Sequence, residues 1–256
     1  MRQTPVSTFK RMVYAFFCST DEDSVFYENL HFKLLERYIN IFDEVIFCIT
    51  INDINDIDTI KRIEKRVLSI RNGDVIFKIY ENTNYRETFV YYNEIFLKMK
   101  ELNGLTFFAH SKGRGEMESV EEIINFIAGA YFFSLEKIDD VWKYPFYGSF
   151  KMINNSPMKH KGLKYMWFYV GTFFWGDYQR IYKEKSKFLP KFSSRWFNEM
   201  LPGELYWPEE CGSYSDGFVA GKMFNAFHLL NEVYGKTPLI KDFYFLYNNL
   251  LNTFIK

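Results

Sequence analysis

The sequence predicts an α/β fold, in which a Rossmann-type, mostly parallel sheet is flanked by helices and followed by a helical C-terminal part. Apolar runs alternate with segments of helical periodicity throughout the first half of the chain. This alternation favours parallel strands joined by crossover helices. The apolar runs are nearly continuous rather than alternating with polar residues, which is typical of strands that are covered on both faces.

The predicted strands of the first half are short runs rich in β-branched and aromatic residues: Met12–Cys18, Glu44–Ile51, Val75–Tyr80 and Leu105–Ala109. The predicted helices between them carry apolar residues at helical spacing: Ser24–Ile41, Asp58–Ile70 and Glu87–Leu102. Asn72-Gly73 predicts a turn, and Asn103-Gly104 predicts the C-cap that ends the third helix.

The second half is less regular. Helices are predicted over Ser119–Phe133, Phe218–Tyr234 and Ile240–Ile255, and strands over Phe146–Ile153 and Met166–Phe174. Several prolines and glycines predict a loop-rich segment over Lys187–Gly217. Because no repeat, low-complexity tract or linker interrupts the chain, we treat residues 1–256 as a single domain.

Charge and composition exclude several classes of protein. The formal net charge is +0, whereas a nucleic-acid binder ordinarily has a basic excess, so we expect no nucleic-acid partner. The cysteines Cys18, Cys48 and Cys211 lie far apart, which argues against a disulfide framework and a zinc site. The 21% aromatic share has two explanations: an A/T-rich genome, or aromatic side chains that line a sugar site.

The N-terminal segment Met1–Lys10 is polar and lacks the apolar core of a signal peptide. No apolar stretch approaches the ~20 residues that a membrane-spanning helix needs. We therefore expect a cytoplasmic protein. A peripheral contact with the inner face of the membrane stays open.

Ligands of parallel α/β sheets bind beyond the carboxyl ends of the strands. The segments at these ends are Ser19–Ser24, Asn52–Asp58, Glu81–Glu87 and His110–Gly115. The strongest local signal is the last one, where an apolar strand ends in His110-Ser111-Lys112-Gly113. His110 can coordinate a metal or orient a phosphate, Ser111 can donate a hydrogen bond, and Lys112 is a charge suited to a diphosphate. The alternative is a polar loop with a solvated lysine.

This tetrapeptide resembles the Y-F-H-T-K-G box of glycosyltransferases from bacterial polysaccharide loci, which are similar to the rhamnan-synthesis family. Asn84–Glu87 resembles in part their N-x-G-R-E element, without its glycine. Val170–Trp175 resembles their G-N-F-W-W box, with Thr172 in place of asparagine. Arg195 and Glu204 resemble their R…E-x-W element, and the order of all four elements agrees.

The resemblance implies a GT-A-like fold that binds a nucleotide-sugar donor and a glycan or lipid-linked glycan acceptor, as in capsule or lipopolysaccharide assembly. Residues 1–115 would form the nucleotide-binding half, and residues 116–256 the acceptor half with the C-terminal helices. We expect donor contacts from Ser19, Thr20, Asp21, Arg86, Glu87, Ser111 and Lys112. The catalytic candidates are His110 and Glu204, the latter as general base of an inverting transfer.

Trp175 is predicted to stack on an acceptor sugar and Asp177 to hydrogen-bond its hydroxyls, with core packing as the alternative for Trp175 and its aromatic neighbours. An exposed loop carboxylate is the alternative for Glu204. For Glu87, the alternative is a charge that favours the start of a helix. A non-catalytic glycan- or nucleotide-binding module is the alternative to an enzyme.

No metal site is assigned. Many A-type enzymes bind Mn²⁺ or Mg²⁺ through D-x-D at a strand tip, because hard cations bridge carboxylates to a diphosphate. The D-x-D triplets are Asp21-Glu22-Asp23 and Asp56-Ile57-Asp58, and neither follows the fourth predicted strand. Asp56 and Asp58 precede an amphipathic helix and favour capping. A metal-independent site, in which Lys112 and Arg86 neutralise the diphosphate, is therefore a second option.

Overall fold

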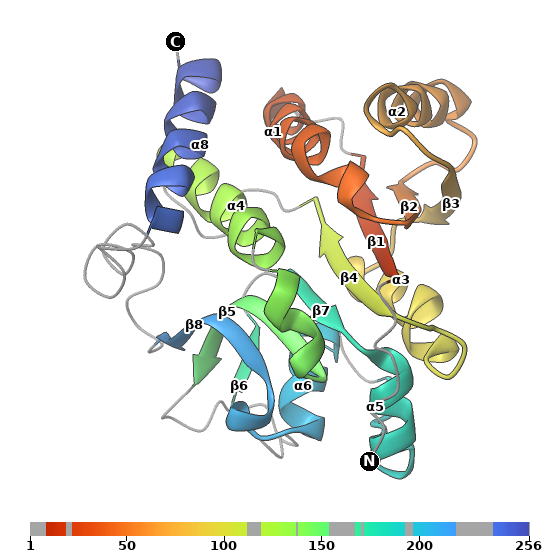
Figure 1. Ribbon diagram of the computed structural model, residues 1–256. Helices are drawn as coiled ribbons and strands as arrows, with labels where there is room; N and C mark the ends of the chain where they lie inside the picture. The colour runs from red at the N-terminus through yellow and green to blue at the C-terminus, as the bar shows by residue number, and fades with distance from the viewer. Residues whose placement is uncertain are drawn as a thin grey trace.

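A computed structural model gives the structure of this chain and describes residues 9–18, 22–111, 119–136, 138–153, 167–169, 172–192, 197–218 and 238–255. It is an α/β fold built on one eight-stranded sheet (Figure 1). The strands are β1 Lys10–Phe17, β2 Glu44–Ile51, β3 Val75–Glu81, β4 Leu105–His110, β5 Phe146–Ile153, β6 Trp167–Tyr169, β7 Phe174–Gly176 and β8 Gly212–Phe218. The strand order is β3-β2-β1-β4-β7-β5-β6, with β8 paired to β5.

The helices are α1 Glu22–Tyr38, α2 Ile57–Ile70, α3 Glu87–Glu94, α4 Val120–Leu135, α5 Tyr178–Lys185, α6 Phe197–Leu205 and α8 Pro238–Phe254. Short 3₁₀ turns are η1 Ile39–Ile41, η2 Phe96–Lys98, η3 Ile138–Lys143, η4 Ser186–Phe188 and η5 Pro208–Glu210. β1 pairs in parallel with β2 and β4, and β2 pairs in parallel with β3. The predicted βαβ alternation of the first half is confirmed.

Helices cover both faces of the sheet, so the central strand β1 is buried on both sides (Figure 1). Met12, Tyr14 and Phe16 point into a core that α1, α2, α4 and α8 complete. Val13 and Ala15 point into a second core that α3, α5 and α6 complete. β3, at the edge, alternates between partly buried and exposed residues, as an edge strand with one solvated side does.

The second half differs from the prediction in two places, and a third predicted element lies almost entirely outside the described residues. The strand expected over Met166–Phe174 is two strands, β6 and β7, both antiparallel to β5. The segment expected to be loop-rich contains α6 and β8, and α5 precedes it. The expected helix Phe218–Tyr234 lies outside the described residues except for Phe218, which ends β8.

Burial in the tertiary structure explains why α6 forms in a segment that the sequence predicts to be a loop. Pro202 and Gly203 lie inside this helix and disfavour it locally. However, Phe197, Leu201 and Leu205 recur every four residues and are all buried in the second core. Packing of one apolar stripe therefore outweighs local propensity, as is usual for short helices.

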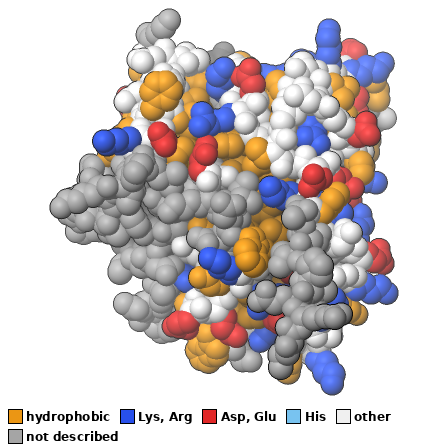
Figure 2. Space-filling view, viewed as in Figure 1, with side chains coloured by type: hydrophobic (Ala, Val, Ile, Leu, Met, Phe, Trp, Pro, Cys, Tyr) orange, Lys and Arg blue, Asp and Glu red, His pale blue; other side chains and the backbone are white. Residues whose placement is uncertain are grey.

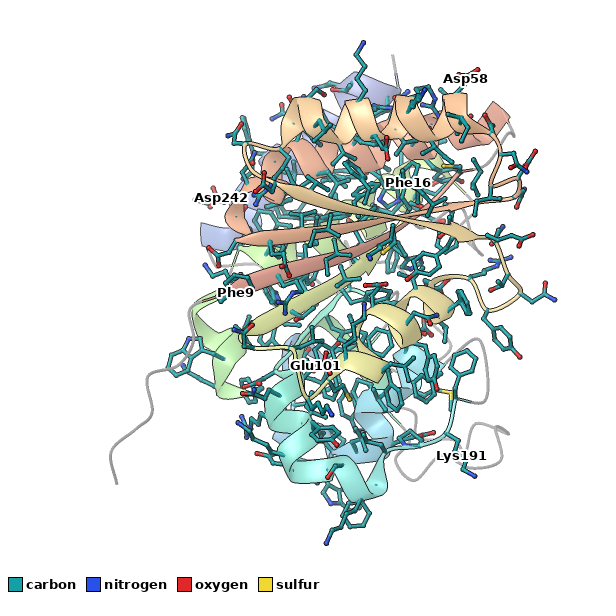
Figure 3. The ribbon with its side chains drawn as sticks, turned by 90° about the vertical axis from the view of Figure 1, so that its right-hand side faces the viewer. Phe9, Phe16, Asp58, Glu101, Lys191 and Asp242 are labelled. Atoms are coloured by element: carbon teal, nitrogen blue, oxygen red, sulfur yellow. The ribbon has the colours of Figure 1, made fainter. Side chains whose placement is uncertain are left out.

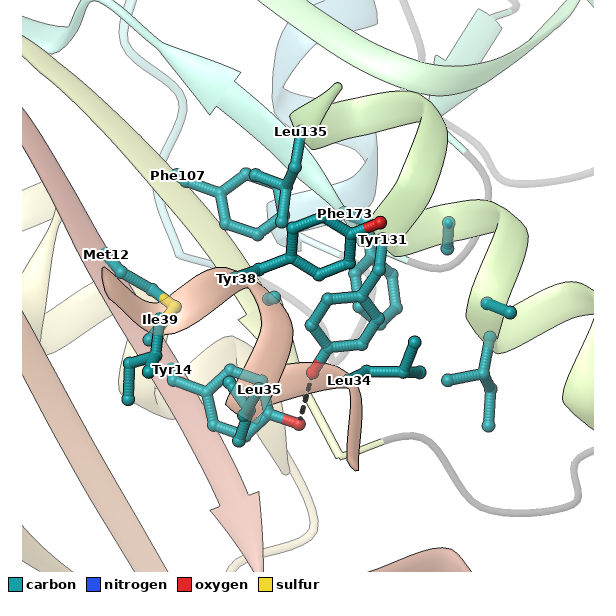
Figure 4. Close-up of a cluster of buried hydrophobic side chains, with 14 of the residues drawn as sticks. Met12, Tyr14, Leu34, Leu35, Tyr38, Ile39, Phe107, Tyr131, Leu135 and Phe173 are labelled. Atoms are coloured by element: carbon teal, nitrogen blue, oxygen red, sulfur yellow. Dashed lines mark hydrogen bonds between the residues drawn. The ribbon is translucent and has the colours of Figure 1, made fainter. Parts of the chain in front are cut away.

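Two tyrosines and one histidine form a buried polar network beside the first core, and Figure 4 shows the hydrogen bond between the two tyrosines, Tyr14 and Tyr131. The hydroxyl of Tyr131 donates to that of Tyr14 over 2.8 Å, and the Tyr14 hydroxyl lies 2.9 Å from Nδ1 of His31. All three residues are fully buried, and burial raises the pKa of both phenols. The network joins β1, α1 and α4, so it fixes the spacing of these elements in a way that apolar packing alone does not.

The described surface carries charges of both signs. Figure 2 shows acidic and basic side chains intermingled over the part of this face that is not grey. Arg62 and Arg66 of α2, for example, both pair with Glu28 of α1. Among the helices that the structure describes, none has the length and apolar character needed to cross a membrane.

Gly104, just before β4, has φ +74°, and a Cβ atom there would lie 2.3 Å from the carbonyl oxygen of Phe9. Gly104→Ala should therefore lower the free energy of unfolding by about 1–3 kcal/mol, which chemical denaturation measures. Gly73→Ala is the control, because a Cβ there meets the side chain of Arg71 rather than backbone. Equal stability losses in the two variants would contradict this account of Gly104.

Candidate functional site

A polar pocket of about 560 Å³ opens at the carboxyl ends of β2 and β3, lined by Asn52, Asn82, Thr83, Asn84 and Arg86. Asn52 follows β2 and Asn82 follows β3, and Nδ2 of Asn82 donates to Oδ1 of Asn52 over 2.9 Å. Parallel α/β sheets bind ligands at this edge. The lining residues fall within segments that the sequence analysis places at the strand ends.

Figure 3 shows the direction of the sheet, because β1 runs past Phe9 at one end and reaches Phe16 at the other. Asp58, in the first turn of α2, lies on the side of Phe16, which is therefore the carboxyl edge. The side chain of Asp56 caps α2 by accepting the N–H of Thr59 over 3.1 Å, and this bond lowers the pKa of Asp56. The predicted capping role of Asp56 is confirmed.

Arg86 has an unusual backbone conformation, with φ 49° and ψ −131°. The N–H of Thr88 donates to the carbonyl of Tyr85 over 3.1 Å, so Arg86 occupies the first central position of a type II′ turn. Glycine is favoured there, and another residue costs about 1–3 kcal/mol. The exposed Arg86 side chain has no hydrogen-bond or ion-pair partner in the described part of the chain. The chain thus keeps the unpaired guanidinium of Arg86 at the pocket, although the backbone conformation there would be less costly for glycine.

The first turn of α6 makes hydrogen bonds to two other segments of the carboxyl edge. Thr88 Oγ1 donates to Oδ1 of Asn198 over 2.6 Å, and Thr172 Oγ1 donates to Oε1 of Glu199 over 3.1 Å. Thr88, Asn198 and Thr172 are fully buried. Within the described chain, Nδ2 of Asn198 is buried without a hydrogen-bond partner, which is rare for an amide and costs stability.

Thr172 lies where the strand beside β5 is interrupted. β8 occupies one edge of β5, so β6 and β7 share the other. The pairs Gly148↔Phe174 and Lys151↔Tyr169 differ in register by two residues, so the pairing along this edge of β5 is interrupted between them. Thr172 has φ +61°, a conformation that β-branched residues rarely adopt and asparagine adopts more easily.

The structure places His110 and Ser111 at the carboxyl edge, at the end of β4. The His110 ring is buried and lies 6.4 Å from the Phe17 ring and 5.7 Å from the Phe173 ring. Ser111 Oγ accepts the N–H of Phe17 over 2.7 Å, which holds the hydroxyl between β1 and β4. The Ser111 oxygen therefore has a structural role as a hydrogen-bond acceptor, although its hydroxyl hydrogen can still be donated to a ligand.

The other predicted donor residues divide into two groups. Glu87 lies in the first turn of α3, next to Arg86, where a negative charge favours the helix dipole. Lys112 lies outside the described residues, and so do the side chains predicted to contact the nucleoside, Ser19, Thr20 and Asp21. Among the residues that the structure describes, no group of three or more histidine, cysteine or acidic side chains could hold a metal ion.

The predicted acceptor residues are corrected by the structure. Trp175 is fully buried, its ring stacks 5.5 Å from that of Phe42, and its Nε1 donates to the carbonyl of Ser134 over 2.7 Å. Asp177 caps α5 by accepting the N–H of Arg180 over 3.0 Å. Because Gly176 pairs with Thr106 near the start of β4, Asp177 lies at the amino edge, away from the pocket. Core packing, the alternative for Trp175, is what the structure shows.

Glu204 is a helix residue rather than a loop carboxylate, and burial raises its pKa. It lies six positions after Asn198, or ~9 Å along the axis of α6, and has no hydrogen-bond or ion-pair partner in the described chain. Glu199 is the α6 carboxylate bound to the carboxyl edge. Sequence reasoning missed Asn198 and Glu199 because they fall in the expected loop. The four-residue spacing of Phe197, Leu201 and Leu205 is the signal that predicts the helix.

No protein-family model matches this chain, and no curated protein is significantly similar to it. The fold and the geometry of the carboxyl edge therefore carry the functional argument.

Because the pKa of Glu204 is raised, this residue is predicted to destabilise the folded protein by an amount that depends on pH. The folded protein keeps this carboxyl protonated to a higher pH than the unfolded chain does, so its ionisation lowers stability as pH rises from about 4. Glu204→Gln should therefore melt at a higher temperature than the wild type at pH 7, and the difference should vanish near pH 3. Glu209→Gln, at an exposed carboxylate, is the control. A difference that is constant with pH would contradict the prediction.

Proposed function

We propose that this protein is a glycosyltransferase with a GT-A-like fold, which moves a sugar from a nucleotide-sugar donor to a glycan or lipid-linked glycan acceptor. Capsule, lipopolysaccharide or another surface glycan would be the product. The observation that carries the proposal is Arg86, a free cation on a glycine-type backbone conformation at a polar pocket on the carboxyl edge. The resemblance of His110–Gly113 and Asn84–Glu87 to transferase boxes supports the same assignment.

The chemistry of the pocket suits a nucleotide diphosphate. A guanidinium binds phosphate oxygens through two parallel hydrogen bonds. The amides of Asn52, Asn82 and Asn84 and the hydroxyl of Thr83 can each donate and accept, as a nucleoside requires. In transfer, charge develops on the leaving diphosphate, and Arg86 with Lys112 would stabilise it. Ser111 would add a hydrogen bond from the end of β4.

The lining residues fit a metal-independent site better than a Mn²⁺ or Mg²⁺ site. Hard divalent cations prefer carboxylate oxygens, and the described lining offers amides, a hydroxyl and a guanidinium. The cations of Arg86 and Lys112 would then take the role that a metal has in many A-type enzymes. An inverting transfer also needs a general base near the acceptor hydroxyl. Glu204 is the candidate from the family resemblance, and the carboxyl-edge position of Glu199 makes it the second.

A non-catalytic glycan- or nucleotide-binding module is the second candidate function. The positions of the two expected acceptor residues favour this binding module, because Trp175 lies in the core and Asp177 caps a helix. Sugar release from a nucleotide-sugar donor separates the two functions, since a binding module does not turn the donor over. For the transferase we propose a cytoplasmic location, with a peripheral contact at the inner face of the membrane where lipid-linked acceptors lie.

The test is a thermal-shift screen against UDP, GDP, CDP, dTDP and CMP, with and without Mn²⁺. A bound nucleotide at ~100 times its dissociation constant should stabilise the wild type by about 2.7 kcal/mol. Arg86→Ala should weaken that nucleotide ~10- to 100-fold, the size of a lost charged hydrogen bond. Arg86→Gly should lose the same affinity yet be more stable than Arg86→Ala by about 1–2 kcal/mol, because glycine accepts φ 49°.

The two variants separate the roles of the side chain and the backbone. Wild-type affinity in both would contradict the assignment of Arg86 to the diphosphate. Binding of glycans without affinity for any nucleotide would contradict the transferase and support the binding module.

A further inference from the structure

Among the described residues, Arg86 and Thr172 are the non-glycine residues with positive φ. They are far apart in the sequence and belong to different elements. Yet both are tied to consecutive residues of α6, because Asn198 binds Thr88 and Glu199 binds Thr172. One helical turn therefore holds both strained segments of the carboxyl edge.

Asn198 holds the turn that contains Arg86. Thr88 closes this turn through its N–H, which bonds the carbonyl of Tyr85, and its hydroxyl bonds Oδ1 of Asn198. Both side chains are fully buried. Loss of either partner would leave the other without this bond in a place that water does not reach, so the contact strongly favours one position of the turn.

Glu199 holds Thr172, which lies where the pairing along β5 is interrupted. Its carboxylate accepts the hydroxyl of Thr172, and the next residue, Phe173, packs its ring against those of His110 and Tyr131. The position of Glu199 thus affects how the Phe173 ring packs beside His110 at the end of β4.

We propose that Asn198 and Glu199 are positioning residues that fix the carboxyl edge in its binding conformation. Asn198 keeps the Arg86 guanidinium directed at the pocket, and Glu199 keeps Phe173 against His110. The network contains two strained residues and an unpaired buried amide, all of which cost stability. Such costs gather where a conformation serves a ligand rather than the fold. The ligand part of this inference rests on the proposed function, and the conformational part does not.

Thr88→Val and Thr88→Ser form a matched pair for the test, because valine keeps the shape and removes the hydroxyl whereas serine keeps the hydroxyl. Hydrogen–deuterium exchange of the segment Thr83–Phe89 is measured without ligand. The dissociation constant of the nucleotide found in the screen is measured below the melting temperature of each variant. Thr88→Val should exchange at least about 10-fold faster and bind about 10-fold more weakly, and Thr88→Ser should match the wild type. Thr88→Ala replaces the valine variant where that fails to fold.

Glu199→Gln and Glu199→Leu form the second matched pair, because glutamine keeps an oxygen that accepts the Thr172 hydroxyl and leucine does not. With donor turnover as readout, Glu199→Leu should lower kcat about 10-fold or more at nearly unchanged donor KM and Glu199→Gln should match the wild type, whereas loss of a general base would lower kcat in both variants.

Each result decides one part of the proposal. Unchanged exchange in Thr88→Val would overturn the conformational role of Asn198, and fast exchange with unchanged affinity would overturn its link to Arg86. Unchanged kcat in Glu199→Leu, or an equal loss of kcat in Glu199→Gln, would overturn the positioning role of Glu199. Absence of nucleotide binding by the wild type would contradict the proposed function instead, while the exchange data would still decide whether Asn198 holds the turn.

Discussion

Burial of β1 on both faces is the constraint on which the rest of the structure depends. Its residues from Met12 to Phe16 are almost completely inaccessible, and β2 and β4 occupy its two edges. Helices must therefore cover both faces of the sheet, which the crossover connections supply. Polar groups that are to meet a ligand can then only lie at the strand ends. The pocket at Asn52 and Asn82 and the hydroxyl of Ser111 follow from this restriction.

At the carboxyl edge, some residues adopt conformations that their local sequence preferences disfavour. Arg86 and Thr172 occupy conformations that suit glycine or asparagine, and Asn198 buries an unpaired amide nitrogen. Elsewhere in the described chain, Asp56 and Ser119 cap their helices and the positive φ before β4 falls on Gly104, as local preferences predict. Both non-glycine residues with positive φ in the described chain lie at this edge, and backbone strain of this kind is typical of functional sites.

The many aromatic residues are largely used in packing. Trp175 stacks on Phe42 and packs at a tilt against Phe107, and Tyr14 stacks on Phe47. Buried hydroxyls and indole N–H groups make this core more specific than an aliphatic one, because Tyr14, Tyr131 and Trp175 each satisfy a hydrogen bond inside it. Aromatic content by itself is therefore a weak sign of a sugar site in this chain.

The sequence by itself determined the strands of the first half, the presence of the helices between them, the segments at the carboxyl edge and the cap at Asp56, because periodicity and capping are local properties. It did not determine where the third helix ends, since α3 stops at Glu94 and not at the predicted Asn103-Gly104 cap. Only the tertiary structure decided three further features: the helix at α6, the burial of Trp175 and the position of Glu199. Each depends on partners far away in the sequence. Phe42 and Phe107 cover Trp175, and the second core stabilises α6 despite Pro202. Long-range packing energies decide such positions, and for α6 the local signal, the four-residue spacing of Phe197, Leu201 and Leu205, competes with Pro202 and Gly203 in the same segment.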